Sequence, residues 1–329
     1  MDILHTIARL APNTAACLGA FDGLHLGHQA LLNRASELAP HIAVVTFEHH
    51  PAHVLAPGHG PALLQSNRQR ERVCRALHVD TLVFLPFDRE VASWSAHEFV
   101  HRVLIGGLSP SVLIVGTDFR FGRSRSGGVE ELHTWLSNAG IAVEVVTPIA
   151  PPMGMPGTKL GSSAIRTAVA RGDVEQAAAM LGRWYALSGT VVTGARRGRS
   201  LGFPTANIAS DSTLMSANGV YATFLSVWDE TSALFGRVWP SVTNVGTNPT
   251  FSHGEPQAPW LETHVLDEDL GEALYGLDVE VSFLARLRDE QRFTSVGALV
   301  AQIHADIAAA RPSFTSSAFE QTILPARST

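Results

Sequence analysis

The pattern of apolar and polar positions divides the chain into two halves of different character. Between residues 40 and 150, short apolar runs alternate with stretches of helical periodicity, for example HIAVVTFE, NRQRERVCRALH, TLVFLPF, AHEFVHRVLIGG, SVLIVG, EELHTWLSNAG and IAVEVVTP. This alternation predicts an α/β fold with a parallel sheet and helices on both faces. After residue 189 short strands follow one another without helices, which predicts a small antiparallel β-barrel with a terminal helix over SVGALVAQIHADIAAAR. We expect the boundary between residues 183 and 188, giving modules 1–185 and 186–329.

Composition agrees with two globular modules and excludes several classes. The chain has 329 residues, with 45% hydrophobic and 16% charged positions. The first residues lack a basic region followed by an apolar core, and no run approaches the length of a membrane span, so we expect a soluble, cytoplasmic protein without membrane partners. The net charge of −6 falls entirely on residues 186–329, which carry 9 Lys and Arg against 15 Asp and Glu. An acidic half argues against nucleic-acid binding.

Cysteines and histidines give no metal centre. Cys17 and Cys74 fit a reducing compartment, and neither has a partner at metal-ligand spacing, so we expect both in the core. Four histidines are crowded between residues 49 and 59, but no cysteine or second cluster completes a zinc site.

The decamer GAFDGLHLGH, residues 19–28, carries the strongest chemical signal. An apolar run, AACL, precedes it and a helical pattern, QALLNRASELA, follows, so it lies on a strand-to-helix turn. Free N–H groups and the positive end of a helix dipole make such a turn a phosphate site. His25 and His28 are three residues apart and can reach one phosphate. The alternative is a glycine-rich turn with two ordinary surface histidines. The remaining candidate phosphate-binding residues here are Gly19, Phe21, Asp22 and Gly23.

Two further motifs follow predicted elements of the first half. GTDFRFG, residues 116–122, is either a turn that packs its aromatic side chains or a loop whose Asp118 holds a hydroxyl or base edge of a nucleotide. KLGSSAIR places Ser162 and Ser163 at a helix N-terminus, with Arg166 one turn in. Alone it is an N-cap, worth about 1 kcal/mol. Beside the histidine motif it predicts a clamp for phosphates.

In the second half, TGARRGR is a candidate phosphate loop or simply a flexible basic hairpin. FPTAN follows, where Thr205 and Asn207 offer oxygen ligands for Mg²⁺. A carboxylate must then orient or deprotonate an attacking hydroxyl. Glu262 in LETHVL is a candidate, although spacing alone makes it one acid among 15 in this half.

These ordered motifs resemble the bacterial bifunctional riboflavin kinase/FMN adenylyltransferases, also called FAD synthetases. The decamer resembles the signature G-x-F-D-G-x-H-x-G-H of nucleotidyltransferases, and likeness to the adenylyltransferase module runs nearly through residues 15–185. It implies a Rossmann-like module in which His25, His28 and Arg166 are catalytic and no covalent intermediate forms. We assign Glu48, His50, Phe119 and Arg120 to the flavin side or to loops of this site, with TFEHHP as a phosphate- or flavin-facing loop. The sequence departs from the family where TFEHHP replaces T-F-D-P-H-P and where Gly161 replaces valine.

The second half resembles the riboflavin kinase module over nearly its whole length, through GRSLGFPTAN, NGVYA, NVGTNPTF and LETHVLD. The resemblance implies that Thr205 and Asn207 bind Mg·ATP and that Glu262 is the catalytic base. It assigns Gly194, Gly198, Arg199 and Gly202 to ATP phosphates and Asn244, Gly246, Thr250 and Phe251 to the flavin side.

The expected function is FAD biosynthesis in two magnesium-dependent steps, from riboflavin and ATP to FMN, and from FMN and ATP to FAD and pyrophosphate. One alternative is a kinase whose adenylyl transfer has been lost through Glu48, His49 and Gly161. Another is a flavin-binding regulatory protein with vestigial nucleotide sites. The sequence leaves open whether the chain forms a homo-oligomer.

Overall fold

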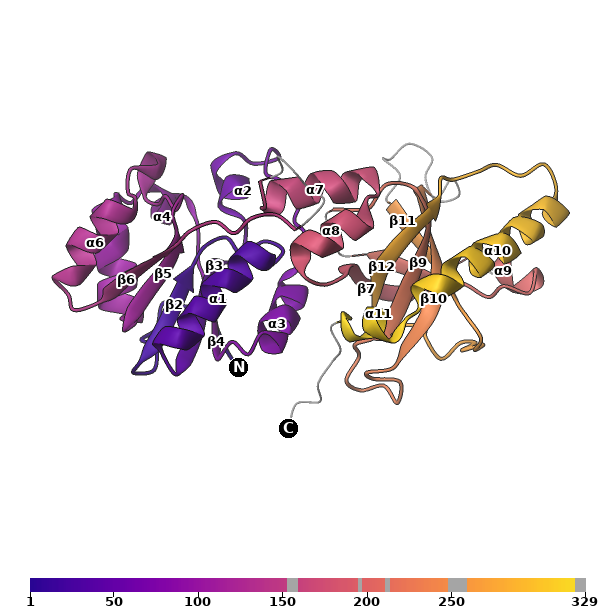
Figure 1. Ribbon diagram of the computed structural model, residues 1–329, viewed down its shortest axis with the longest axis horizontal. Helices are drawn as coiled ribbons and strands as arrows, with labels where there is room; N and C mark the ends of the chain where they lie inside the picture. The colour runs from indigo at the N-terminus through magenta and orange to yellow at the C-terminus, as the bar shows by residue number, and fades with distance from the viewer. Residues whose placement is uncertain (153–158, 195–196, 211–213, 248–258, 323–329) are drawn as a thin grey trace. The chain divides into compact units, whose positions relative to one another are not determined.

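The computed structural model describes residues 1–152, 159–194, 197–210, 214–247 and 259–322. The chain forms two compact units, the first comprising residues 1–63 with 67–162 and the second residues 64–66 with 163–329 (Figure 1). Among the described residues, no helix is both long and apolar enough to cross a membrane.

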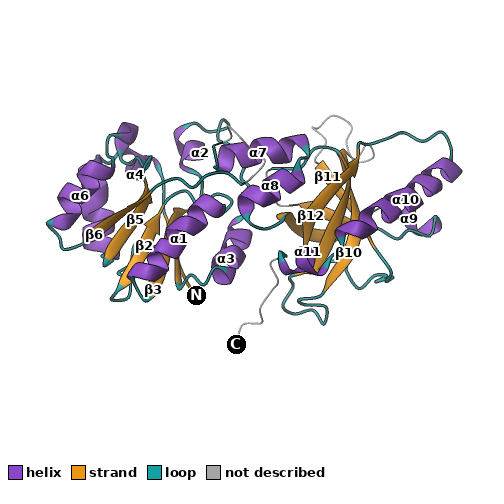
Figure 2. Ribbon diagram, viewed as in Figure 1, coloured by secondary structure: helices purple, strands orange, loops and turns teal. Residues whose placement is uncertain are grey.

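The first unit is built on a six-stranded parallel sheet, which confirms the predicted α/β fold (Figure 2). Its order is β1-β4-β3-β2-β5-β6. The sheet's core strands are buried apolar runs, as in parallel sheets covered on both faces. Strand bounds are β1 (Asp2–Leu4), β2 (Thr14–Leu18), β3 (His41–Phe47), β4 (Thr81–Leu85), β5 (Val112–Gly116) and β6 (Ala142–Val146). Among the described strands of this sheet, only the three-residue β1 is absent from the sequence prediction.

The predicted helices of this unit form, with one difference in winding, and three short helices at residues 51–55, 89–93 and 123–125 were not predicted. Helix α1 packs on β2, β3 and β5, and α6 packs on β6. The predicted helix AHEFVHRVLIGG begins as α5 and continues as a π-helix, η1. The bounds are α1 (Leu26–Leu38), α2 (Pro51–Leu55), α3 (Asn67–Ala76), α4 (Arg89–Ser93), α5 (Ala96–Phe99), η1 (Val100–Leu108), η2 (Arg123–Arg125) and α6 (Val129–Ser137).

The second unit contains the predicted closed antiparallel barrel, in the order β10-β11-β8-β7-β12-β9. Its strands are β7 (Tyr185–Val192), β8 (Ala206–Ser210), β9 (Gly219–Val227), β10 (Val238–Thr247), β11 (Pro259–Val265) and β12 (Asp278–Arg288). The predicted terminal helix is α10 (Val296–Ala310), preceded by α7 (Ser162–Arg171), α8 (Val174–Leu181) and α9 (Arg197–Ser200) and followed by η3 (Arg311–Ser313) and α11 (Ser316–Glu320).

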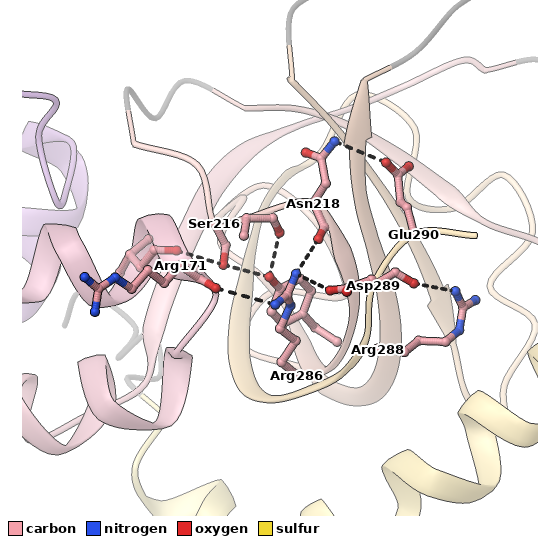
Figure 3. A network of polar contacts seen from close by, with 10 residues as sticks. Arg171, Ser216, Asn218, Arg286, Arg288, Asp289 and Glu290 are labelled. Atoms are coloured by element: carbon pink, nitrogen blue, oxygen red, sulfur yellow. Dashed lines mark hydrogen bonds and ion pairs between the residues drawn. The ribbon is translucent and has the colours of Figure 1, made fainter. Parts of the chain in front are cut away.

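Two sets of polar contacts, of which the first is largely buried, link other parts of this unit to the barrel. Asp306 of α10 accepts two hydrogen bonds of 2.8 Å from the guanidinium of Arg288 on β12. At the end of α7, Arg286 of β12 donates to the carbonyl oxygens of Arg171 and of Asn218, the residue before β9 (Figure 3). Gly172, with φ +82°, lets the chain pass closely over this guanidinium. The end of α7 is therefore fastened to the barrel.

The two compact units meet between residues 162 and 163, within the first turn of α7. Consequently, α7 and α8 pack with the barrel, whereas the sequence placed the functional boundary between residues 183 and 188. Both predicted core cysteines are buried, which confirms that expectation.

Candidate active sites

The first site lies where the order of strands in the parallel sheet reverses. Strands β3 and β4 follow β2 on one side, and the chain then crosses to place β5 on the other side of β2. In such sheets ligands bind beyond the carboxyl ends of the strands at this switch point. The decamer follows β2 and GTDFRFG follows β5, so the topology brings these two motifs to one edge.

The decamer forms the predicted strand-to-helix turn and brings its two histidines together. His25 is the N-cap of α1, and its Nδ1 accepts the backbone N–H of His28 at 3.3 Å. Because Nδ1 accepts, Nε2 of a neutral His25 carries the proton and can donate it to a phosphate. The two rings stack with centroids 3.7 Å apart. Phe21 packs on His28 at 4.9 Å, and Gly23 has φ +88°.

Asp22, a residue of this turn, is buried at 1% exposure. Its carbonyl oxygen accepts a hydrogen bond from Oγ of Ser162 at 2.8 Å, so one predicted clamp serine does contact the phosphate turn. Ser163 and Arg166 belong to the second compact unit. A Cβ at Gly161 would meet no atom within 4 Å. The glycine therefore makes no close approach that a valine would block.

In the loop GTDFRFG, Asp118 is exposed to solvent whereas the two aromatic side chains are packed. Asp118 pairs with Lys159 at 3.1 Å, an interaction worth at most about 1 kcal/mol. Phe119 stacks on buried Phe121 at 5.6 Å, as expected of a packed turn. The Arg120 guanidinium lies against Gly128.

In TFEHHP, Glu48 is exposed and its carbonyl accepts from Asn67 Nδ2. His50 caps α2 by accepting the N–H of Ala52 at 3.2 Å. His50 thus has a structural role in this conformation.

The second site is a row of polar side chains across three neighbouring strands of the barrel. In the register, Glu262 of β11 stands directly opposite Asn207 of β8 and also opposite Asn244 of β10. Directly opposed residues share a sheet face, with Cβ atoms about 4.5–5.5 Å apart. The carboxylate therefore lies between two amides, although these residues are far apart in sequence.

Glycines of the predicted phosphate loop lie against this row. A Cβ on Gly194 would collide with the amide of Asn207, and one on Gly198 would meet Thr205 Oγ1 at 3.3 Å. Gly202 has φ +86° in the turn after α9, and Arg199 lies near Gly271. The structure thus brings Gly194, Gly198, Thr205 and Asn207 together.

Two neighbours of this row escaped the sequence prediction. The indole of Trp260 donates to Oδ1 of Asn207 at 3.0 Å. Glu290 accepts from Asn218 at 3.1 Å and lies against the backbone of Gly246. Trp260 stands two residues before Glu262 on β11, just outside the motif LETHVL, and Glu290 lies two residues beyond the end of β12. The predicted flavin-side residues Thr250 and Phe251 lie outside the described residues.

These features define a phosphate-transferring enzyme with a nucleotidyltransferase-type turn in one unit and a second polar site on a barrel. Comparisons with known proteins agree. The FAD synthetase family model matches residues 8–155, and the riboflavin kinase family model matches residues 181–314. The chain belongs to the bifunctional riboflavin kinase/FMN adenylyltransferase family.

Relatives of that name match almost end to end. The Pseudomonas fluorescens protein is 36% identical and the alignment covers 94% of this chain and 97% of the relative. The Bacillus subtilis protein is 33% identical, with 92% and 93% covered, and the Escherichia coli K12 protein is 34% identical, with 94% and 96% covered. A crystal structure described as a macrolide-efflux protein from Streptococcus pneumoniae superposes with a TM-score of 0.80 at 31% identity, covering 92% of this chain and 95% of that one. The predicted family, fold class and pair of activities are confirmed.

Proposed function

We propose that the two reactions of this family take place at the two sites described, with adenylyl transfer assigned to residues 1–185 and riboflavin phosphorylation to residues 186–329. The observation that supports this most directly is the presence of two separate sets of reacting groups. One is the stacked pair His25 and His28 at the switch point. The other is the row Asn207, Glu262 and Asn244 on the barrel. Each reaction attacks a different phosphorus of ATP, so two differently shaped sites suit the chemistry.

In adenylyl transfer, a phosphate oxygen of FMN attacks the α-phosphorus of ATP and the bond to pyrophosphate breaks. No side chain needs to form a covalent bond, and rate enhancement comes from positioning and charge stabilisation. His25 donates through Nε2, and His28 beside it donates to the same α-phosphate or to the leaving pyrophosphate. Backbone N–H groups of Gly19, Phe21 and Gly23 bind phosphate oxygens.

The remaining adenylyl-transfer assignments rest on the family resemblance. Ser162, Ser163 and Arg166 bind the β- and γ-phosphates, with Asp22 and Asp118 on the nucleotide side. The flavin side takes Glu48, His50, Phe119 and Arg120.

In the kinase reaction, the terminal ribityl hydroxyl of riboflavin attacks the γ-phosphorus of ATP, and ADP leaves. Glu262 is the general base that accepts the hydroxyl proton. The phosphate loop is formed by Gly194, Gly198, Arg199 and Gly202. It can come close to Thr205 and Asn207 because Gly194 and Gly198 have no side chains. Asn244, Gly246, Thr250 and Phe251 form the flavin side.

Magnesium fits the oxygen atoms that Thr205 and Asn207 offer at the start of β8. Oδ1 of Asn207 accepts one hydrogen bond, from Trp260, and an amide oxygen has a second lone pair. Thr205 supplies a hydroxyl oxygen two residues earlier, and hard oxygen atoms are the ligands that Mg²⁺ prefers. Thr205 and Asn207 would hold the ion, which would neutralise charge on the ATP phosphates. We place the enzyme in the cytoplasm, where its two buried cysteines stay reduced.

A product assay with two separate feeds tests the proposal. Purified protein with Mg²⁺ and ATP should convert riboflavin to FMN and then to FAD, and should convert supplied FMN directly to FAD. A halt at FMN with both feeds would leave a kinase alone, as the departures in TFEHHP suggest. Flavin binding without ATP turnover in either feed would favour the regulatory alternative.

A further inference from the structure

A buried arginine lies behind the phosphate turn of the first unit, and the reactions described so far give it no role. Arg70 is on α3 and is only 2% exposed. Its Nη1 donates to the carbonyl oxygen of Phe47 at 2.9 Å and to Oγ1 of Thr46 at 3.4 Å. The guanidinium carbon lies 5.8 Å from the centre of the Phe84 ring. Within the described part of the chain, its buried Nε has no hydrogen-bond partner.

The contacts of Arg70 lead to the decamer by two routes. Thr46 is fully buried, and its hydroxyl donates to the carbonyl oxygen of Ala20 at 2.9 Å. The second route is electrostatic, through the buried carboxylate of Asp22. Burial lowers the pKa of Arg70, and the nearby charge of Asp22 opposes that effect. A guanidinium remains charged even so. The cation thus supports Ala20 and Asp22 from behind.

The same turn of α3 also holds the loop that follows β3. Phe47 is the last residue of β3, and its carbonyl accepts from Arg70. Asn67, three residues before Arg70 and on the same helix face, donates to the carbonyl oxygen of Glu48 at 3.1 Å. One helical turn therefore joins the phosphate turn to the loop TFEHHP.

A buried guanidinium with only some of its N–H groups hydrogen-bonded contributes little to the stability of the fold. Taking the charge out of water is costly, and an apolar side chain of similar volume often gives equal or greater stability. The strand ends it contacts need no cation to pair in the sheet. What Arg70 provides instead is a link between the phosphate turn, through Thr46, and the loop that follows Phe47.

We propose that Arg70 is a positioning residue for adenylyl transfer, which sets the phosphate turn at residues 20–22 relative to the flavin-side loop that begins at Glu48. This inference rests on the proposed function, because it takes the first loop as binding ATP and the second as facing FMN. In-line attack requires the two reacting groups to be aligned, and a misplacement of about 1 Å can lower a rate about 100-fold. The effect should appear in kcat more than in KM, because each loop can still bind its own substrate.

The test uses Arg70→Met in the full-length enzyme, with Arg75→Met as the matched control. Arg75 is an exposed arginine of the same helix, so its substitution removes the same charge without touching either loop. Steady-state rates are measured for FAD formation from FMN and ATP, and for FMN formation from riboflavin and ATP. The kinase rate serves as an internal reference for the amount of active enzyme, since its groups lie in the other compact unit, and the KM values for ATP and FMN report whether the first unit is folded.

We expect Arg70→Met to lower kcat for FAD formation about 100-fold, with KM for ATP and FMN changed less than about threefold. FMN formation and all rates of Arg75→Met should stay within about twofold of the unsubstituted enzyme. Arg70→Lys keeps the charge near Asp22 but loses the forked geometry, so it should recover about tenfold of the lost rate. Equal FAD rates in Arg70→Met and Arg75→Met would overturn the inference, as would an equal fall in both reactions.

Thr46→Val provides a second route if Arg70→Met does not fold. It removes only the hydroxyl between Arg70 and Ala20, and we expect about a tenfold fall in kcat for FAD formation. An unchanged kcat would refute the positioning role. His28→Ala separates this inference from the proposed function. If His28→Ala leaves FAD formation intact, the assigned site is wrong. If it removes FAD formation while Arg70→Met does not, only the role of Arg70 is wrong.

Discussion

Replacing Glu262 by glutamine separates its proposed chemistry from its place in the barrel. Glutamine has nearly the same volume, and the side chain of Glu262 is exposed between Asn207 and Asn244, so the register of β11 should not change. An exposed substitution of this kind typically alters stability by less than about 0.5 kcal/mol. A general base contributes about 100- to 10,000-fold to the rate, which corresponds to about 3–5 kcal/mol of transition-state stabilisation.

Glu262→Gln should therefore lower kcat for FMN formation by at least about 100-fold. KM for riboflavin and the midpoint of chemical unfolding should remain nearly unchanged. FAD formation from supplied FMN gives a second reading from the same preparation and should not fall. Glu230→Gln, an exposed acid after β9, is the matched control. If kcat for FMN formation stays within about threefold of the control, Glu262 is not the base and another acid of this half must be sought.

Three other predictions address separate parts of the molecule. His28→Ala should lower FAD formation about 100-fold, the typical effect of removing one donor to developing charge, and should leave FMN formation intact; parallel loss of both products would contradict the assignment. Asp306→Ala leaves the mostly buried Arg288 without its carboxylate and should destabilise the barrel unit by about 3–5 kcal/mol in urea unfolding, whereas a change below about 1 kcal/mol would show that the pair is dispensable. Burial raises the pKa of the Cys17 thiol far above its ordinary value, so peptide mapping should find it unalkylated in the native enzyme. Because the unfolded thiol ionises near pH 8.5 and the folded one does not, its contribution to stability should be present below about pH 8.5 and lost as the pH rises; Cys17→Ser should weaken that dependence.

Long elements with a strong apolar pattern could be predicted from the sequence, because the residues that they bury are close to one another along the chain. The apolar runs of β3, β4 and β5 and the closing helix α10 are examples. Strand β1 has only three residues, and its pairing with β4 is a long-range contact that no local pattern reveals. The π-helical winding of η1 also could not be predicted from the pattern of apolar residues. Gly106 and Gly107 lie close to the carbonyls of His101 and Arg102, where β-carbons would be crowded.

Whether a site residue could be predicted also depends on whether its contacts are local in sequence. His25 and His28 are near in sequence, so a turn and a helix start suffice to bring them together. Asn207, Glu262 and Asn244 meet only through strand register, and the family resemblance rather than spacing singled out Glu262. Neither Trp260 nor Glu290 was predicted, because Trp260 is marked only by its hydrogen bond across strands to Asn207 and Glu290 lies beyond the end of β12.

Arg70 did carry a signal in the sequence. It stands three and four residues before Val73 and Cys74, which places an arginine on the apolar face of a predicted helix. A charged residue at such a position is either misassigned or bound to something buried, and here it contacts the end of β3. The position of Arg70 in the helical pattern does not show which group the side chain contacts.

The two sites fix their reacting groups by different means, and this difference explains why their supporting residues were not equally visible. On the barrel, the candidate phosphate loop can approach Asn207 and Thr205 closely because Gly194 and Gly198 carry no side chains, and glycines in a loop are conspicuous in sequence. In the first unit, the turn is held from behind by buried polar side chains, Thr46 and Arg70, which belong to a different strand and helix. A support built from side chains can be weakened in graded steps, from arginine to lysine to methionine. Changing it should alter the alignment of substrates before it alters their binding, since the groups that touch the substrates remain in place.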